Sequence, residues 1–293
     1  MSVVVDLDRV EANIHRFHAG AARHGLAVRA HVKAHRSPPI AARQVAAGAV
    51  GVAVHSAKEA ELYATRGIDD IVIAWPWRDG WRAERFAALT GRCRLTVHVD
   101  TADILAGYRG TGVGIRLDVD TGLHRVGVAP ENAVALARAV AATDGVRLDG
   151  VTGYRGVESA DEVADREQVG RAQAMLLVEV AEAIRADGIP CPVVCAGGTA
   201  TASGAATVPG VTELCSGVYA TYDAGSADIG LCSIDDVAVS VTDPGVLAGC
   251  DQPWNPGVVS QVSGDRVLPA HVCPLAKVSA SEEWPACVLP DRR

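Results

Sequence analysis

The sequence predicts a (β/α)8 TIM-type barrel with a second, small and shortened β domain. Short apolar runs alternate with Ala-rich amphipathic stretches from the first residues to about Tyr222. The apolar runs are continuous, which indicates strands buried on both faces of a parallel sheet. There are eight such runs, the number of strands in a TIM-type barrel. A doubly wound open sheet is the alternative, but no Gly-x-Gly-x-x-Gly follows an early strand.

The barrel elements follow one another in a regular order. Several of the amphipathic stretches are preceded by Ser, Asp or Pro, which are residues that favour the start of a helix. We expect helices that include 39–47, 57–66, 131–143 and 161–187. We expect the eight strands at 28–33, 51–55, 70–74, 94–99, 113–119, 146–154, 192–196 and 211–219.

The residue pattern of the chain changes after Asp223. Helical periodicity ends there, and Gly and Pro become frequent. Short β-like runs follow at 235–241, 257–262 and 266–275, and the first run of the chain, 3–7, is a further strand that could join them. The predicted domains are therefore a barrel over 9–222 and a small β domain built from 1–8 and 223–293.

Composition excludes several classes of protein. The 293 residues are 49% hydrophobic and 21% charged, with a net charge of −8. Scattered Lys and Arg argue against a nucleic-acid surface, and no apolar run approaches the roughly 20 residues of a membrane-spanning helix. The N-terminus lacks the pattern of a signal peptide, so we expect a cytoplasmic protein whose eight cysteines are mostly reduced core residues.

Lys33 is the first candidate for chemistry. It ends the first predicted barrel strand within Arg-Ala-His-Val-Lys-Ala-His-Arg (29–36), and barrel active sites form at that end of the strands. Neighbouring cationic groups and partial burial would lower the pKa of its amine and leave it nucleophilic enough for Schiff-base chemistry. The alternative is a solvated lysine in a basic loop.

Two glycine-containing segments form the second candidate site. Gly198 and Thr199 follow the seventh predicted strand, and Gly217, Val218 and Tyr219 end the eighth. Backbone amides beside glycine can approach an anion, and these loops are the recurrent phosphate site of barrels. An ordinary glycine turn is the alternative.

The third candidate is a metal site in the β domain. His271 and Cys273 are two residues apart, so in an extended strand an imidazole and a thiolate point to the same side. Two protein ligands suit an open site completed by water or substrate. A buried histidine beside a core cysteine is the alternative. Arg125 after the fifth strand and Tyr154 at the end of the sixth are further candidates for contact with an anion or cofactor.

Together these segments resemble the family of D-threonine aldolase and D-serine dehydratase, pyridoxal-phosphate enzymes with the alanine-racemase-type fold (fold type III). The resemblance is carried by the order of several motifs more than by any one of them. They are Arg-x-His-x-Lys-x-His (29–35) with the segment 37–74, Asp-Thr-Gly-x-x-Arg-x-Gly (120–127), Gly-Tyr-Arg-Gly (153–156), Gly-Gly-Thr (197–199), the run 209–219 and His-x-Cys-Pro (271–274).

The resemblance implies roles for these residues. Lys33 would carry pyridoxal phosphate covalently, and Arg125 and Tyr154 would contact its ring or substituents. The phosphate would lie among Gly198, Thr199, Gly217, Val218 and Tyr219. His271 and Cys273 would hold a divalent metal, zinc rather than manganese because a thiolate is a soft ligand. A homodimer is implied, because the β domain of a partner subunit commonly completes the site.

The resemblance therefore predicts a lyase that acts on β-hydroxy D-amino acids, by retro-aldol cleavage of the D-threonine type. D-serine dehydration is the alternative, and Cys273 follows the dehydratase pattern where aldolases often carry Asp. A non-catalytic pyridoxal-phosphate carrier and an amino-acid racemase are further alternatives. The β domain is shorter than in the family, and Ala270 replaces the Asn common beside the metal histidine.

Overall fold

The computed structural model describes residues 2–77 and 83–242. The chain divides into two compact units. The barrel unit spans 16–217, and the terminal unit combines 1–15 with the chain from 218 onward. Each unit is described by itself.

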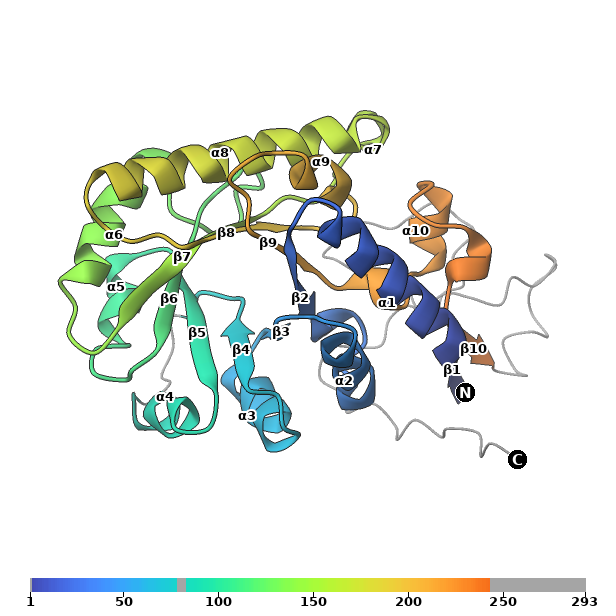
Figure 1. Ribbon diagram of the computed structural model, residues 1–293, viewed down its shortest axis with the longest axis horizontal. Helices are drawn as coiled ribbons and strands as arrows, with labels where there is room; N and C mark the ends of the chain where they lie inside the picture. The colour runs from blue at the N-terminus through green and yellow to red at the C-terminus, as the bar shows by residue number, and fades with distance from the viewer. Residues whose placement is uncertain (1, 78–82, 243–293) are drawn as a thin grey trace. The chain divides into compact units, whose positions relative to one another are not determined.

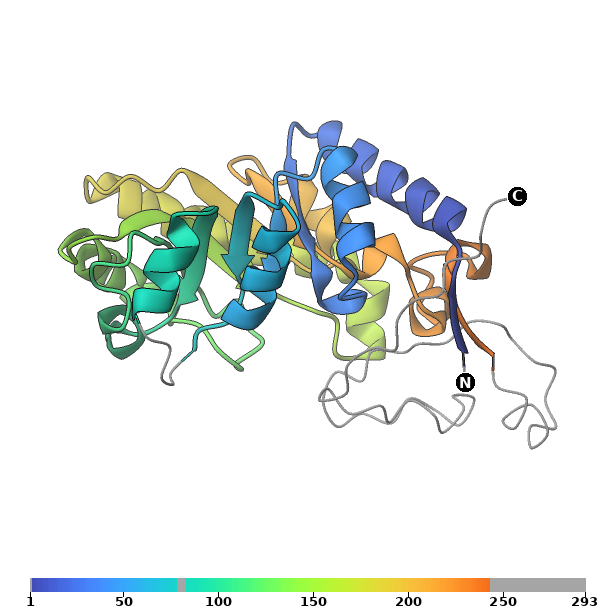
Figure 2. The ribbon, with the colours of Figure 1, turned by 90° about the horizontal axis from the view of Figure 1, so that it is seen from below.

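The barrel unit contains a closed barrel of eight parallel strands, as the sequence predicts. Each strand pairs with the next along the chain, and β2 pairs with β9 to close the barrel. Figures 1 and 2 show α3, α4, α6 and α8 on the outer side of the strands. The strands are β2 (Ala27–His31), β3 (Val52–Val54), β4 (Asp70–Ile73), β5 (Arg94–Val99), β6 (Gly114–Asp118), β7 (Arg147–Tyr154), β8 (Val193–Gly197) and β9 (Glu213–Ser216).

Three helices of this unit, α3, α5 and α7, begin at a Ser or Thr whose side chain caps the helix. Ser56 accepts a hydrogen bond from the backbone of Glu59 (3.2 Å), and the Glu59 carboxylate accepts one from the backbone of His55 (2.8 Å), which anchors the end of β3. The helices are α2 (Pro38–Ala46), α3 (Ala57–Thr65), α4 (Ala83–Thr90), α5 (Ala102–Ala106), α6 (Ala133–Ala141), α7 (Ala160–Ala164), α8 (Arg166–Ala186) and α9 (Ala202–Ala206), with 3-10 turns η1 (Val32–Ala34) and η2 (Pro130–Asn132).

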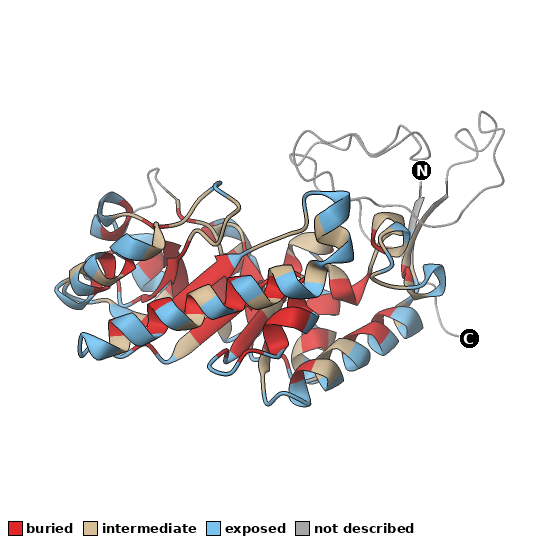
Figure 3. Cartoon of the chain, turned by 90° about the horizontal axis from the view of Figure 1, so that it is seen from above, coloured by how far each residue is buried: buried red, intermediate tan, exposed pale blue. Residues whose placement is uncertain are grey.

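Several predicted elements differ from the observed ones. The strand expected over 211–219 covers only Glu213–Ser216, and the segment expected as a strand over 235–241 begins in a 3-10 turn, with a strand only from Val239. The helix expected over 161–187 is divided at Asp165 into α7 and α8. Lys33 lies in η1 rather than in the strand, because β2 ends at His31. Figure 3 shows that the strands are buried while the helices expose their outer faces, so burial on both faces of the sheet is confirmed.

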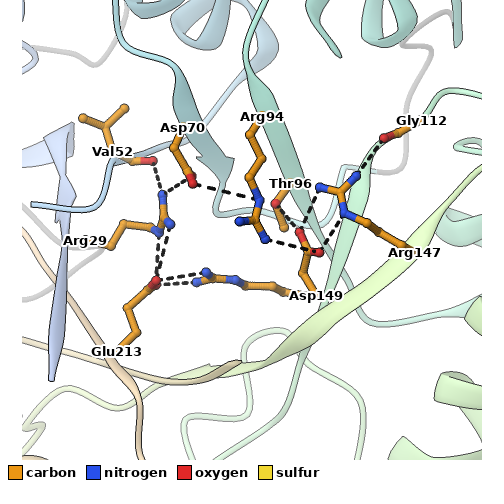
Figure 4. Close-up of polar contacts among 10 residues, drawn as sticks. Arg29, Val52, Asp70, Arg94, Thr96, Gly112, Arg147, Asp149 and Glu213 are labelled. Atoms are coloured by element: carbon orange, nitrogen blue, oxygen red, sulfur yellow. Dashed lines mark hydrogen bonds and ion pairs between the residues drawn. The ribbon is translucent and has the colours of Figure 1, made fainter. Parts of the chain in front are cut away.

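An ionic network crosses the barrel interior toward the amino ends of the strands (Figure 4). The Glu213 carboxylate accepts two hydrogen bonds from Arg29 (3.0 and 3.3 Å) and two from Arg116 (2.5 and 3.1 Å). Arg29 also donates to Asp70 (2.7 Å). Asp149 accepts hydrogen bonds from Thr96 (2.7 Å) and from the guanidinium of Arg147 (2.9 and 3.2 Å). The network pairs charges that would be costly if buried alone.

The terminal unit contains a two-stranded antiparallel sheet. Within it β1 (Ser2–Val5) pairs with β10 (Val239–Thr242). The side chain of Asn13 donates to the carbonyl of Asp236 (2.7 Å) and so joins the N-terminal segment to the segment before β10. The other elements are η3 (Val218–Ala220), α10 (Ala224–Asp228) and η4 (Ile234–Asp236), while α1 (Leu7–Ala22) runs from this unit into the barrel unit.

No helix in the described parts of the chain is both long and apolar enough to cross a membrane.

Candidate functional site

A cavity lies at the carboxyl ends of the barrel strands. Its lining comes from the last residues of the strands and from the loops that follow them. These residues are His31, Lys33, His55, Ala74, Trp75, His98, Asp118, Val119, Asp120, Thr121, Leu123, Arg125, Val126, Thr152, Gly153, Tyr154, Gly197 and Cys215. Three residues predicted from the sequence, Lys33, Arg125 and Tyr154, therefore share one cavity.

The amine of Lys33 faces an aromatic wall of this cavity. Its nitrogen lies 4.9 Å from the centre of the Tyr154 ring, a cation–π distance. Burial lowers the pKa of the amine, the nearby Cys215 sulfur partly opposes this effect, and the charge of Arg125 adds to it. A desolvated amine near another cation is easier to deprotonate, which suits attack on an aldehyde.

Arg125 contributes a second cation to the cavity. Its guanidinium carbon lies 5.4 Å from the centre of the Trp75 ring and 5.5 Å from that of Tyr154. Within 2–77 and 83–242, no carboxylate forms an ion pair with Arg125. Two cavity carboxylates have partners of their own, since Asp118 contacts His98 and Asp120 contacts His124. The arrangement therefore favours an anionic ligand.

Three histidines line the cavity. The rings of His31 and His55 meet edge to face at 4.9 Å, and Nδ1 of His98 lies 3.3 Å from the Asp118 carboxylate. Burial lowers the pKa of His31 well below its usual value, and it lowers that of His55 to about 4, aided by the charge of Lys33. His31 and His55 are therefore neutral near pH 7 and do not compete with Arg125 as cationic groups of the cavity.

The sequence motifs did not indicate these histidines as site residues. A signal was present, because His55 and His98 stand at the carboxyl ends of predicted strands, where barrel sites form. Trp75 directly follows another strand end, but nothing in its local sequence distinguishes it from a core aromatic residue.

The glycines of the predicted phosphate loops lie where backbones approach closely. A side chain at Gly217 would place its Cβ 2.3 Å from the carbonyl oxygen of His31, and one at Gly198, whose φ is +119°, would meet Thr201 at 2.6 Å. The Gly198 amide donates to the Cys215 carbonyl (3.2 Å), so this donor is used within the fold. Thr199 follows in the same loop.

Side chains behind the cavity hold two of its strand ends together. The buried amide of Gln173, on α8, donates to the carbonyls of Gly153 (2.8 Å) and Gly197 (3.1 Å). The hydroxyl of Thr201 donates to the carbonyl of Arg155 (3.0 Å). Gln173 thus bridges the paired ends of β7 and β8, and the bond from Thr201 to Arg155 continues the connection beyond their last pair.

The remaining predicted residues are in other parts of the chain. Val218 and Tyr219 begin the terminal unit, where they form part of η3. His271 and Cys273 lie outside the described residues. Within the described ranges, no three His, Cys, Asp or Glu side chains are placed to hold a metal ion. The predicted metal pair therefore stays a prediction.

The cavity residues fit pyridoxal phosphate. Lys33 offers an amine of lowered pKa to an aldehyde, and Tyr154 and Trp75 offer aromatic surface to a ring. Arg125 supplies positive charge for an anionic group.

Known proteins resemble this chain over most of its length. A family model described as the alanine racemase N-terminal domain matches residues 5–221. D-threo-3-hydroxyaspartate dehydratase of Delftia sp. (strain HT23) is 35% identical over 269 residues, which cover 86% of this chain and 69% of the relative. D-threonine aldolase of Arthrobacter sp. is 34% identical, with 76% of this chain and 61% of the relative covered.

Solved structures agree with these matches. The dehydratase from Delftia sp. HT23 has a TM-score of 0.72 and 33% identity, covering 82% of this chain and 66% of the solved chain. D-threonine aldolase from Filomicrobium marinum has a TM-score of 0.71 and 26% identity, covering 83% and 69%. The chain thus belongs to the family of proteins that carry the alanine racemase N-terminal domain, with the dehydratase and the aldolase among its relatives.

Proposed function

We propose that this protein is a pyridoxal-phosphate- and divalent-metal-dependent lyase that cleaves β-hydroxy D-amino acids by a retro-aldol reaction of the D-threonine type. The observation that carries the proposal is the position of Lys33. Its amine lies in a cavity at the carboxyl end of a parallel barrel, with a lowered pKa and with Arg125 and Tyr154 around it. Relatives named as an aldolase and a dehydratase support the class of reaction.

Bound pyridoxal phosphate supplies an electron sink for the charge that develops at the substrate's Cα. Lys33 would hold the cofactor through its aldehyde, and its amine would move a proton at the substrate's Cα. Arg125 and Tyr154 would orient the ring, while Gly198, Thr199, Gly217, Val218 and Tyr219 would bind the phosphate. His271 and Cys273 would hold zinc, or manganese, which lowers the pKa of the β-hydroxyl.

The lysine is tested by chemical reduction. The chain contains three lysines, Lys33, Lys58 and Lys277. Purified protein loaded with pyridoxal phosphate and treated with borohydride is expected to carry the label on Lys33, as read by mass spectrometry. Lys33→Ala should abolish the label, whereas Lys58→Ala, at an exposed position on α3, should leave it unchanged. A label retained by Lys33→Ala would refute the assignment.

The reaction is tested by its products. D-threonine is expected to give glycine and acetaldehyde, and a chelator should stop the reaction until zinc or manganese is added. His271→Ala and Cys273→Ala should show the same loss without a chelator. Loading with pyridoxal phosphate and no turnover of any D-amino acid would instead indicate the carrier, and interconversion of D- and L-alanine would indicate a racemase.

Dehydration is the second candidate function. The relative that covers 86% of this chain is a dehydratase, compared with 76% for the aldolase. A structure of D-threo-3-hydroxyaspartate dehydratase with a cysteine replaced by alanine is described as metal-free. If this chain is a dehydratase, D-serine gives pyruvate and ammonia, and 3-hydroxy-D-aspartate gives oxaloacetate and ammonia. Aldol cleavage of 3-hydroxy-D-aspartate gives glycine and glyoxylate, so one substrate separates the two reactions.

A homodimer is part of the proposal. Light scattering of the loaded protein is expected to give twice the mass of the chain, which is 30.3 kDa.

A further inference from the structure

The loop that carries Arg125 has an unusual backbone. Three of its residues, Gly122, His124 and Gly127, have positive φ values of +104°, +54° and +116°. His124 is a non-glycine residue in the left-handed region, a conformation that costs energy and persists only when its surroundings hold it. Residues 120–127 therefore need contacts that fix their path.

The carboxylate of Asp120 supplies such contacts. One of its oxygens accepts hydrogen bonds from the backbone amides of Gly122 and His124, both at 3.0 Å, and the other lies 2.8 Å from Nδ1 of His124. An aspartate that binds amides two and four residues ahead closes a tight turn. Burial disfavours the charge of Asp120, but these hydrogen bonds outweigh it and lower the pKa of the carboxyl.

Backbone hydrogen bonds also join the two ends of the loop. The Val128 amide donates to the Asp118 carbonyl (2.8 Å), and the Asp120 amide donates to the Val128 carbonyl (3.0 Å). A Cβ at Gly127 would lie 2.5 Å from the Asp120 nitrogen, so the two strands of the loop touch. Between these ends, Asp120 supplies three of the contacts that fix the path of 121–125, and the Thr121 hydroxyl adds a hydrogen bond to the Tyr154 carbonyl (3.4 Å).

Arg125 follows directly after the last residue bound by Asp120. Its guanidinium lies between the rings of Trp75 and Tyr154, without a carboxylate partner among the described residues. Cation–π contacts of this kind hold a flexible side chain only weakly. The direction of Arg125 is therefore set by its backbone.

We propose that Asp120 is a positioning residue, which closes the loop and holds the Arg125 guanidinium between Trp75 and Tyr154, facing the cavity. The consequence for binding rests on the proposed function, in which Arg125 contacts pyridoxal phosphate.

The position of Arg125 can be measured without any ligand. Its Nε–Hε resonance, identified by its disappearance in Arg125→Lys, is expected to be shifted upfield by the two aromatic rings. Asp120→Ala should return it toward the position of solvated arginines. Asp120→Asn keeps an oxygen for the two backbone amides and should keep most of the shift. An unchanged Arg125 resonance in folded Asp120→Ala would overturn the proposal.

The direction of the change in affinity for pyridoxal phosphate separates a positioning role of Asp120 from an effect of its charge. If Asp120 acted only through its negative charge, its removal would strengthen the binding of an anion. Positioning predicts the reverse: Asp120→Ala weakens pyridoxal phosphate binding about ten-fold, close to the loss in Arg125→Ala, and the double variant loses little more. Asp120→Asn, which removes the same charge, should bind nearly as well as the wild type.

The control removes a carboxylate elsewhere. Asp187→Ala deletes the partner of Arg138 on an exposed part of the barrel unit and should change neither the Arg125 resonance nor the affinity. Equal or tighter binding in Asp120→Ala, where Arg125→Ala binds more weakly, would overturn the inference. If Arg125→Ala binds normally, the proposed role of Arg125 is wrong, and the resonance alone decides the role of Asp120.

Discussion

The two ends of the barrel use charged residues in opposite ways. Toward the amino ends of the strands, Glu213 receives four hydrogen bonds from Arg29 and Arg116, and Asp70 pairs with Arg29 (Figure 4). At the carboxyl ends, Lys33 and Arg125 contact aromatic rings instead of carboxylates. Paired charges hold strands together, whereas cations without a carboxylate partner are available to a ligand.

The electrostatic effects differ in the same way. Burial opposes the charge of Glu213, but Arg116 and Arg29 outweigh it and lower its pKa to about 2, so the network keeps its charges. At the cavity, burial dominates, and it lowers the pKa of Lys33, His31 and His55. One end of the barrel thus stabilises ions, and the other favours neutral bases.

Breaking the ionic network is expected to have the largest effect on stability. Glu213→Gln leaves two buried arginines without their shared carboxylate and should lower the free energy of unfolding by about 3–5 kcal/mol. Urea unfolding followed by circular dichroism measures this loss. The matched control is Asp187→Asn, which weakens an exposed ion pair and should cause no measurable change. A similar stability for the two variants would mean that the buried network contributes little.

As the pH falls, the stability contributed by buried histidines at the carboxyl end of the barrel should be lost before that contributed by the ionic network at the amino end. Burial lowers to about 4 the pKa of His55, which lines the cavity, and that of His35, whose buried ring contacts the Gln44 side chain (3.1 Å). Between pH 6.5 and 4 the unfolded chain therefore binds more protons than the folded one. The contribution of these neutral histidines to the free energy of unfolding is complete above pH 6.5 and is lost as the pH falls from 6.5 to 4. The contribution of Glu213 is complete above pH 4.5 and is lost as the pH falls toward 2.

The order in which the histidines and Glu213 lose their contributions to stability can be measured. Thermal unfolding between pH 7.5 and 4.5 should show a falling Tm in the wild type and a weaker dependence in His55→Gln. Glu213→Gln should keep the dependence above pH 4.5, because its effect lies at lower pH. A wild-type Tm that does not change over this range would contradict the buried neutral state of the histidines.

The smallest expected effect concerns Lys33 in the absence of cofactor. Lys33→Met replaces a desolvated amine with an apolar side chain of similar length, and we expect stability to rise by about 1 kcal/mol. Lys58→Met, at an exposed position, should have no effect. A loss of stability in Lys33→Met would show that the amine has a structural partner and is not held for a ligand.

The barrel could be predicted because its signal is local. The strands are short segments rich in apolar residues, and the helices between them carry amphipathic patterns. The division at Asp165 was not predicted, because the residues on both sides favour helix. Lys33 was expected within a strand, but a hydrogen bond from its amide to Nδ1 of His31 begins a 3-10 turn instead (3.4 Å).

The ionic network and most of the cavity could not be predicted in this way. Glu213 binds Arg29 and Arg116 across 184 and 97 residues, and no local pattern shows which charges will meet. The same holds for Trp75 and Arg125, whose contact depends on two different loops. Lys33, Arg125 and Tyr154 were selected because strand ends meet at one end of a parallel barrel, a rule that needs no knowledge of contacts.

The closure of the barrel by β2 and β9 has a consequence for the order of events during synthesis. Lys33 follows the first barrel strand, but Cys215 and the carboxylate of Glu213 belong to the last. Until the ribosome has added about 180 further residues, the last strand of the barrel is missing from around Lys33 and the amine remains solvated. A chain that is still being made therefore holds a solvated lysine, and the burial that lowers the pKa of its amine is complete only when the final strand docks.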